Sequence, residues 1–177
     1  MIHFENISFE RKGKSIFSGL SLTVNPFEKL LIQGRSGMGK TTLLKLILGF
    51  ETPDSGQIRI NSQPVIPSEI GDIRQQIFYL SQDIDLRNQP VRSLIDDIYA
   101  NFAIQPPEAG DMGRLIDFFE LETSVLDRNA GDLSGGERQR TGLMIGCLLD
   151  RPVWLLDEPT SALEQQLKEK VARFILE

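Results

Sequence analysis

The residues best suited to chemistry lie in a glycine-rich stretch that carries a lysine and a threonine. Residues 34–41 read Gly-Arg-Ser-Gly-Met-Gly-Lys-Thr, which fits the phosphate-binding pattern G-x-x-x-x-G-K-[ST]. Glycines let the backbone turn tightly and gather its N–H groups into an anion site. Lys40 would supply a positive charge for the β- and γ-phosphates, and the Thr41 hydroxyl can ligate Mg²⁺. The alternative is a Gly/Ser turn that merely precedes a helix; the pattern favours a nucleotide phosphate site.

The residues around this loop predict the strand and helix that the pattern requires. The apolar run Leu30-Leu31-Ile32 is typical of a buried strand. After the loop, apolar residues recur at helical spacing at Leu43, Leu44, Ile47 and Leu48. We therefore expect strand, loop and helix to follow one another here.

A second set of candidate residues follows another apolar run near the end of the chain. Residues 153–156, Val-Trp-Leu-Leu, predict a buried strand, and Asp157 and Glu158 come directly after it. Open α/β sheets bind ligands at such strand ends. Asp157 would hold a Mg²⁺ shell and Glu158 would orient the attacking water. Taken alone, this segment could equally be a strand end with two solvated acids; the phosphate loop favours the nucleotide interpretation.

The remaining elements are expected to position these residues. Alternating apolar residues predict two antiparallel strands at the N-terminus. Ser134 and Glu137 form the pattern of a capping box at the start of a helix. Further strands are expected at 57–61 and 77–80, and helices at 91–104, 115–121, 134–150 and from Glu164 to Glu177.

Composition narrows the class of protein. A chain of 177 residues favours one domain, and a net charge of −6 without a basic run argues against a nucleic-acid partner. The single cysteine, Cys147, excludes an internal disulfide and a cysteine zinc cluster. No apolar run is long enough to cross a bilayer, so we expect any membrane role to depend on a partner.

Four segments, in order, resemble the ATP-binding-cassette (ABC) family: GRSGMGKT, LSQD, LSGGERQR and WLLDEPTSALE. The resemblance implies an α/β fold: a P-loop NTPase core with an N-terminal antiparallel β part and a helical lobe. Residues 1–177 would form a single, incomplete nucleotide-binding domain, with 83–150 as its helical lobe and the C-terminal strands of the usual fold missing.

The resemblance also implies a role for each matching residue, with ATP and Mg²⁺ as cofactors. Gln82 would contact Mg²⁺ and the water, Thr41 and Asp157 would complete the metal site, and Glu158 would be the catalytic base. In a head-to-tail dimer, Ser134, Gly135 and Gly136 of one copy would cap the γ-phosphate held by the other. The residues that would wrap the triphosphate are Gly34, Arg35, Ser36, Gly37, Met38, Gly39, Lys40, Thr41 and Thr42.

The leading function implied by this resemblance is the ATP-hydrolysing subunit of a membrane transporter. It would act on the cytoplasmic face of the membrane with a separate permease subunit, as a homodimer or paired with another cassette. A soluble family member acting in DNA repair or translation and a catalytically impaired regulatory fragment are the alternatives.

The chain departs from the family pattern at several positions. Arg11 stands where an aromatic residue usually stacks on adenine, and Glu164 stands where aspartate is usual. The only histidine is His3, too early to be the family's switch histidine, and the chain ends before the strand expected between the other central strands. We therefore expect exposed apolar faces, weak nucleotide binding and slow hydrolysis.

Overall fold

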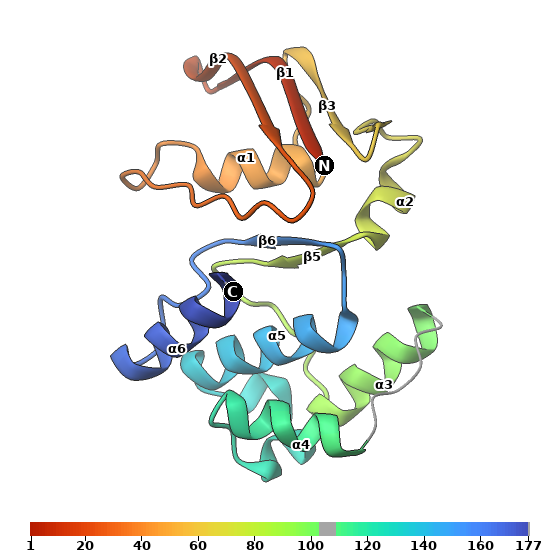
Figure 1. Ribbon diagram of the computed structural model, residues 1–177, viewed down its shortest axis with the longest axis vertical. Coiled ribbons are helices and arrows are strands. Elements are labelled where there is room, and N and C mark those ends of the chain that lie inside the picture. The colour runs from red at the N-terminus through yellow and green to blue at the C-terminus, as the bar shows by residue number, and fades with distance from the viewer. Residues whose placement is uncertain (103–108, 177) are drawn as a thin grey trace. The chain divides into compact units, whose positions relative to one another are not determined.

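The computed structural model describes residues 1–102 and 109–176 (Figure 1). These residues form two compact units, Met1–Ile77 and Phe78–Glu177, and each unit is described by itself. No helix within the described ranges has the length and apolar character needed to cross a bilayer.

The first unit contains the predicted antiparallel strands at the N-terminus. β1 (Ile2–Arg11) pairs with β2 (Lys14–Val24) and with β3 (Ser55–Ile60), and the short β4 (Gln63–Pro64) completes a four-stranded sheet in the order β2-β1-β3-β4.

An irregularity in β1 sets which of its side chains are buried. The register of β1 shifts between Phe4 and Ile7, where Asn6 has a φ of 50°. The extra residue moves the alternation by one position, so that Phe4 and Ile7 both point into the core, at 1% and 0% exposure.

Two helices join this sheet within the first unit. α1 (Lys40–Ile47) follows the glycine-rich loop as predicted and lies along one face of the sheet in Figure 1. Its buried leucines, Leu43, Leu44 and Leu46, contribute to the core because they share one side of the helix. The short α2 (Ile70–Gln75) was not predicted, because six residues hold too few apolar positions to establish a period.

The prediction of a buried strand at Leu30–Ile32 is wrong. Among the described residues, neither sheet includes this run, and Leu30, Leu31 and Ile32 are 45%, 71% and 38% exposed. A strand requires a neighbouring strand to pair its backbone N–H and C=O groups. An apolar run in the sequence supplies the side chains of a strand but not that neighbour.

The second unit contains a pair of strands and most of the helices. β5 (Ile77–Leu80), which begins at the last residue of the first unit, pairs with β6 (Val153–Leu156). The Asp157 N–H donates to the Leu80 carbonyl (2.9 Å), at the carboxyl ends of the two strands. Since the carboxyl ends of β5 and β6 are adjacent, the two strands run parallel.

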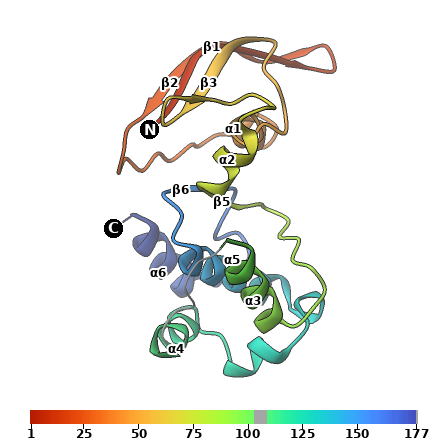
Figure 2. The ribbon, with the colours of Figure 1, turned by 90° about the vertical axis from the view of Figure 1, so that its right-hand side faces the viewer.

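Among the residues of this unit that the structure describes, four α-helices and two short 3₁₀ segments follow β5 or β6. They are α3 (Val91–Phe102), α4 (Ala109–Phe118), η1 (Thr123–Asp127), η2 (Ala130–Asp132), α5 (Gly135–Leu149) and α6 (Gln165–Leu176). In Figures 1 and 2, α5 lies between the β5–β6 pair and α4. Their core includes the fully buried Val91, Phe119 and Met144.

The helix expected at 115–121 differs from the observed α4 at both ends. It begins at Ala109, six residues earlier, because Gly110 and Gly113 interrupt the apolar pattern without preventing helix formation. It ends at Phe118, and Glu120 has a left-handed φ of 53°. The chain therefore leaves the helix just before Leu121.

Candidate functional site

The glycine-rich loop of the first unit holds its lysine close to its own backbone. The Lys40 ammonium Nζ donates to the carbonyls of Gly34 (2.9 Å) and Arg35 (3.3 Å). Gly39 precedes α1 with a φ of 96°, and a Cβ there would lie 2.6 Å from Ile16 Cγ2. Only glycine fits this position without strain, so the close turn predicted from the sequence is confirmed.

The start of α1 is suited to an anion. Gly39 has no side chain to cap the helix, so the N–H groups of the first turn remain directed toward the loop. Thr41 is half-buried and Thr42 buried in this turn, while Ser36 and Met38 are exposed in the loop. N–H groups at a helix start, beside an ammonium, suit a polyphosphate.

In the second unit, the parallel strands bring together two residues that are far apart in the sequence. Gln82, two residues past β5, donates through Nε2 to the Glu158 carboxylate (3.2 Å), two residues past β6. Asp157, next to Glu158, is 4% exposed. Burial, and then the Asp157 charge, raise the pKa of Tyr79.

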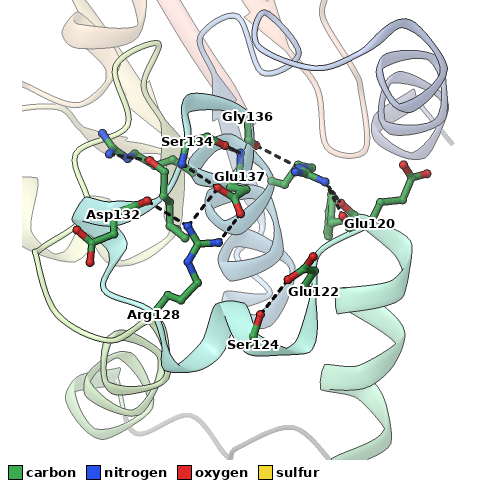
Figure 3. Close-up of polar contacts among 12 residues, drawn as sticks. Glu120, Glu122, Ser124, Arg128, Asp132, Ser134, Gly136 and Glu137 are labelled. Atoms are coloured by element: carbon green, nitrogen blue, oxygen red, sulfur yellow. Dashed lines mark hydrogen bonds and ion pairs between the residues drawn. The ribbon is translucent and has the colours of Figure 1, made fainter.

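The predicted capping box forms at the start of α5. Ser134 Oγ accepts from the Glu137 N–H (3.2 Å), and the Glu137 carboxylate accepts from the Ser134 N–H (2.8 Å) (Figure 3). The Arg128 guanidinium, followed by the hydrogen bonds from Ser134, lowers the pKa of the Glu137 carboxyl to about 2. Glu137 is therefore an ion-paired carboxylate at neutral pH, and Ser134 is fixed beside it.

Arginine side chains hold the backbone that leads into this cap. Arg128 donates to the Asp132 carbonyl (3.1 Å), and Arg138 donates to the carbonyls of Gly131 (3.2 Å) and Leu133 (3.1 Å). The carbonyl groups before Ser134 are thereby satisfied. The exposed Gly135 then presents a helix N-terminus that no side chain of its own covers.

Comparison with known proteins decides the family. A model of the family described as ABC transporter matches residues 17–161. The chain belongs to the ABC transporter family. It is an ATP-binding cassette of a family that hydrolyses ATP.

Relatives of this cassette are longer proteins. It is 34% identical over 185 residues to an ATP-dependent lipid A-core flippase from Cupriavidus metallidurans; the match covers 95% of this chain and 30% of the flippase. It is 32% identical over 180 residues to a probable ABC transporter ATP-binding/permease protein from Haemophilus influenzae, with 99% and 33% coverage. The chain thus spans about a third of the curated relatives it matches.

Solved structures show the same fold. The dimeric structure of the bacterial ABC transporter cassette MJ0796 matches with a TM-score of 0.85 at 23% identity, covering 99% of this chain and 81% of that one. A post-hydrolysis dimer of MJ0796 with ADP and Pi matches equally well, at 22% identity and the same coverage. The predicted ABC ATPase fold, with its N-terminal antiparallel sheet, is confirmed.

The structure shows the surroundings of four residues that the sequence analysis singled out outside the proposed site. The Arg11 guanidinium pairs with the Glu51 carboxylate (3.2 Å). His3 Nδ1 lies 2.8 Å from the Thr23 hydroxyl in the β1–β2 ladder, a structural position. Burial raises the pKa of the Cys147 thiol to about 11, as suits a packing role. The exposed Glu164 accepts a backbone hydrogen bond at the start of α6.

Sequence reasoning missed the residues that support the site from outside its motifs. Arg128 lies six residues before Ser134, and no pattern in the sequence marks it. Gln139 is five residues past Ser134 and only 2% exposed. Its neighbours in the sequence, residues 137–141, are all polar, so only its burial in the structure shows that its amide requires partners.

Proposed function

We propose that this cassette binds and hydrolyses ATP to power transport through a membrane permease. The observation that carries the proposal is the contact of Gln82 with Glu158, beside the buried Asp157. In an α/β fold with a phosphate loop, that position is where nucleotide chemistry takes place.

The loop from Gly34 to Thr42 would wrap the triphosphate. In this role Lys40 exchanges its loop carbonyls for the β- and γ-phosphate oxygens, a charge-assisted contact. Glycine at position 39 supports the assignment, because any side chain there would meet Ile16. The residues assigned to phosphate binding are Gly34, Arg35, Ser36, Gly37, Met38, Gly39, Lys40, Thr41 and Thr42.

The side chains assigned to Mg²⁺ suit a hard cation. Thr41, Gln82 and Asp157 offer hydroxyl, amide and carboxylate oxygens. Mg²⁺ is usually bound by one or two carboxylates together with water and substrate phosphates. The described residues contain no group of three or more His, Cys, Asp and Glu that could hold a metal by themselves. The cation would neutralise developing phosphate charge.

Glu158 would act as the general base toward the attacking water. Gln82 donates to one of its carboxylate oxygens and leaves the other for the water. Gln82 would thereby fix both the base and the position of the nucleophile.

Ser134, Gly135 and Gly136 would cap the γ-phosphate bound by a second copy in a head-to-tail dimer. The capping box, the arginine-held backbone and the exposed glycine support this role, because together they present a rigid helix N-terminus to an anion. The dimeric state of MJ0796 named above supports a dimer for this cassette as well. ATP would then hold two copies together, and its hydrolysis would release them.

The permease is proposed from the family and from the name of the Haemophilus relative, which joins ATP-binding with permease. A cavity of about 370 Å³ in the second unit begins at Gln82 and is a candidate contact for that partner. Its lining residues are Gln82, Asp83, Ile84, Asp85, Gly135, Arg138, Gln139, Ser161 and Ala162. The proposed location is the cytoplasmic face of the membrane, with no nucleic-acid partner.

Measuring Mg-ATP binding and phosphate release with Lys40→Ala and Glu158→Gln tests this function. Lys40→Ala should weaken ATP binding at least tenfold, the effect of about 1.4 kcal/mol. Glu158→Gln should keep binding and abolish turnover. Unchanged ATP affinity in Lys40→Ala would contradict the assignment of the loop.

A regulatory, nucleotide-binding role is the second candidate. ATP binding that depends on Lys40, without turnover that depends on Glu158, would support this candidate instead.

A further inference from the structure

Gln139 uses both ends of its buried amide to hold one turn of the chain. Its Nε2 donates to the Glu158 carbonyl (3.0 Å) and to the Ser161 hydroxyl (3.3 Å), and its Oε1 accepts from the Ala162 N–H (2.9 Å). The side chain belongs to α5, whereas these three partners lie beyond β6. Gln139 therefore fastens α5 to the turn that follows Glu158.

That turn has an unfavourable backbone at Glu158. Its φ is 52°, in the left-handed region that residues other than glycine seldom adopt. Such a conformation persists only when the surroundings impose it. The Glu158 carbonyl accepts from both Gln139 and the Ser161 N–H (3.1 Å). The three hydrogen bonds of the Gln139 amide, called the clasp below, therefore fix the backbone that orients the Glu158 carboxylate.

The N-terminal end of α5, capped by Ser134, also lies close to the turn after Glu158. A Cβ on Gly136 would lie 3.1 Å from the Ala162 carbonyl, so the first turn of α5 approaches the same segment closely. Five residues of helix, about 7.5 Å, separate Ser134 from Gln139. The first turns of α5 thus connect Ser134, Gly135 and Gly136, called the tip below, to the turn at Glu158.

We propose that Gln139 is a positioning residue that couples this tip to Glu158. The inference rests on the proposed function. There, the tip of one copy contacts ATP bound by its partner, whereas Glu158 serves the copy's own ATP. Gln139 consequently links the two nucleotide sites of the dimer, and it acts through the Glu158 turn without touching nucleotide.

The test compares Gln139→Met with Thr141→Val in the full chain. Met keeps the volume and removes every hydrogen bond of the clasp. Thr141 lies on the same helix at 0% exposure, and its hydroxyl finds no partner among the described residues, so Val removes a buried polar group without breaking a bond. A second variant, Gln139→Glu, keeps the acceptor for Ala162 and loses the donor to the Glu158 carbonyl.

We expect Gln139→Met to lower kcat about tenfold, the loss of about 1.4 kcal/mol, with KM for ATP within twofold and a Hill coefficient near one. Amide exchange at Ala162, followed by mass spectrometry, should accelerate in Gln139→Met and stay protected in Gln139→Glu, which should still lose kcat. Thr141→Val should match the parent chain in kcat, in KM, in the Hill coefficient and in amide exchange at Ala162. A purely structural role would not separate kcat from KM in this way.

Wild-type kcat and cooperativity in both Gln139 variants would overturn the coupling while leaving the proposed function in place. Absence of ATP hydrolysis in the parent chain would overturn both. If Gln139→Met does not fold, the kcat and Hill coefficient of Gln139→Glu decide the matter alone.

Discussion

Arg128 donates to the Glu137 carboxylate, and this ion pair lies next to Ser134 at the start of α5 (Figure 3). Glutamate would repel a phosphate if its charge were free. Here the charge is matched by Arg128 and used to accept the Ser134 N–H. Under the proposed function, Glu137 can therefore occupy this position without repelling a phosphate at Ser134.

The capping role of Ser134 and its proposed phosphate contact can be separated by two substitutions. Ser134→Ala should lower the free energy of unfolding by about 1 kcal/mol, because the Glu137 N–H loses its acceptor. Ser134→Asp should keep the cap and the stability. In a Glu158→Gln background, however, Asp should abolish ATP-induced dimerisation, measured by sedimentation, because its charge repels the γ-phosphate. Dimerisation that survives Ser134→Asp would argue against the tip as a phosphate site.

Acid should lower the free energy of unfolding, partly because Glu137 becomes protonated. Its pKa is lowered from 4.5 to about 2 in the folded state. The resulting stability is fully present above about pH 4.5 and is lost as the pH falls toward 2. Gln does not titrate, so Glu137→Gln should show a smaller fall in urea midpoint between about pH 5 and about pH 2. Parallel pH curves for the two proteins would contradict this assignment.

Gly39 should tolerate no side chain. Gly39→Ala should destabilise the first unit by roughly 1–3 kcal/mol and weaken ATP binding, since it combines a left-handed φ with a clash at Ile16. Gly71 is the matched control: it lies inside α2, and a Cβ at this position would have nothing within 4 Å. Gly71→Ala should be neutral or stabilising by urea denaturation. Equal losses in both variants would point to a general intolerance of alanine.

Phe27 should be a source of strain. It has a φ of 64° and is fully exposed at the third position of the turn Asn25–Glu28, after Pro26; the turn closes with a hydrogen bond from the Glu28 N–H to the Asn25 carbonyl (3.1 Å). This position of such a turn favours glycine. Phe27→Gly should stabilise the chain by about 0.5–1 kcal/mol in urea denaturation. Phe27→Ala keeps the strain, so an equal gain there would assign the effect to the lost aromatic ring.

Cys147 should react slowly while the chain is folded. Burial raises its thiol pKa from 9.0 to about 11, and the thiolate is the reactive form. At about pH 8, a thiol-specific reagent should label the unfolded chain about 100-fold faster than the folded one, from the thiolate fractions alone. Equal labelling rates in urea and in buffer would show that the thiol is open to solvent.

The local sequence determined those parts of the site that need only neighbours in the chain. A capping box joins residues three apart, and the glycine loop with its lysine occupies one short segment, so Ser134–Glu137 and Gly34–Thr41 could be identified directly. The residue motifs also determined the family. Strands marked by alternation or by a short apolar run, such as β1 and β6, were equally accessible.

The tertiary structure decided what depends on distant partners. Gln82 meets Glu158 only because β5 and β6 pair in parallel, and Gln139 holds Glu158 only because α5 packs beside the end of β6. Leu30–Ile32 has the side chains of a strand, but neither described sheet includes it. The physical reason is the same in each case: a backbone or side-chain hydrogen bond needs its partner in place, and the fold places that partner.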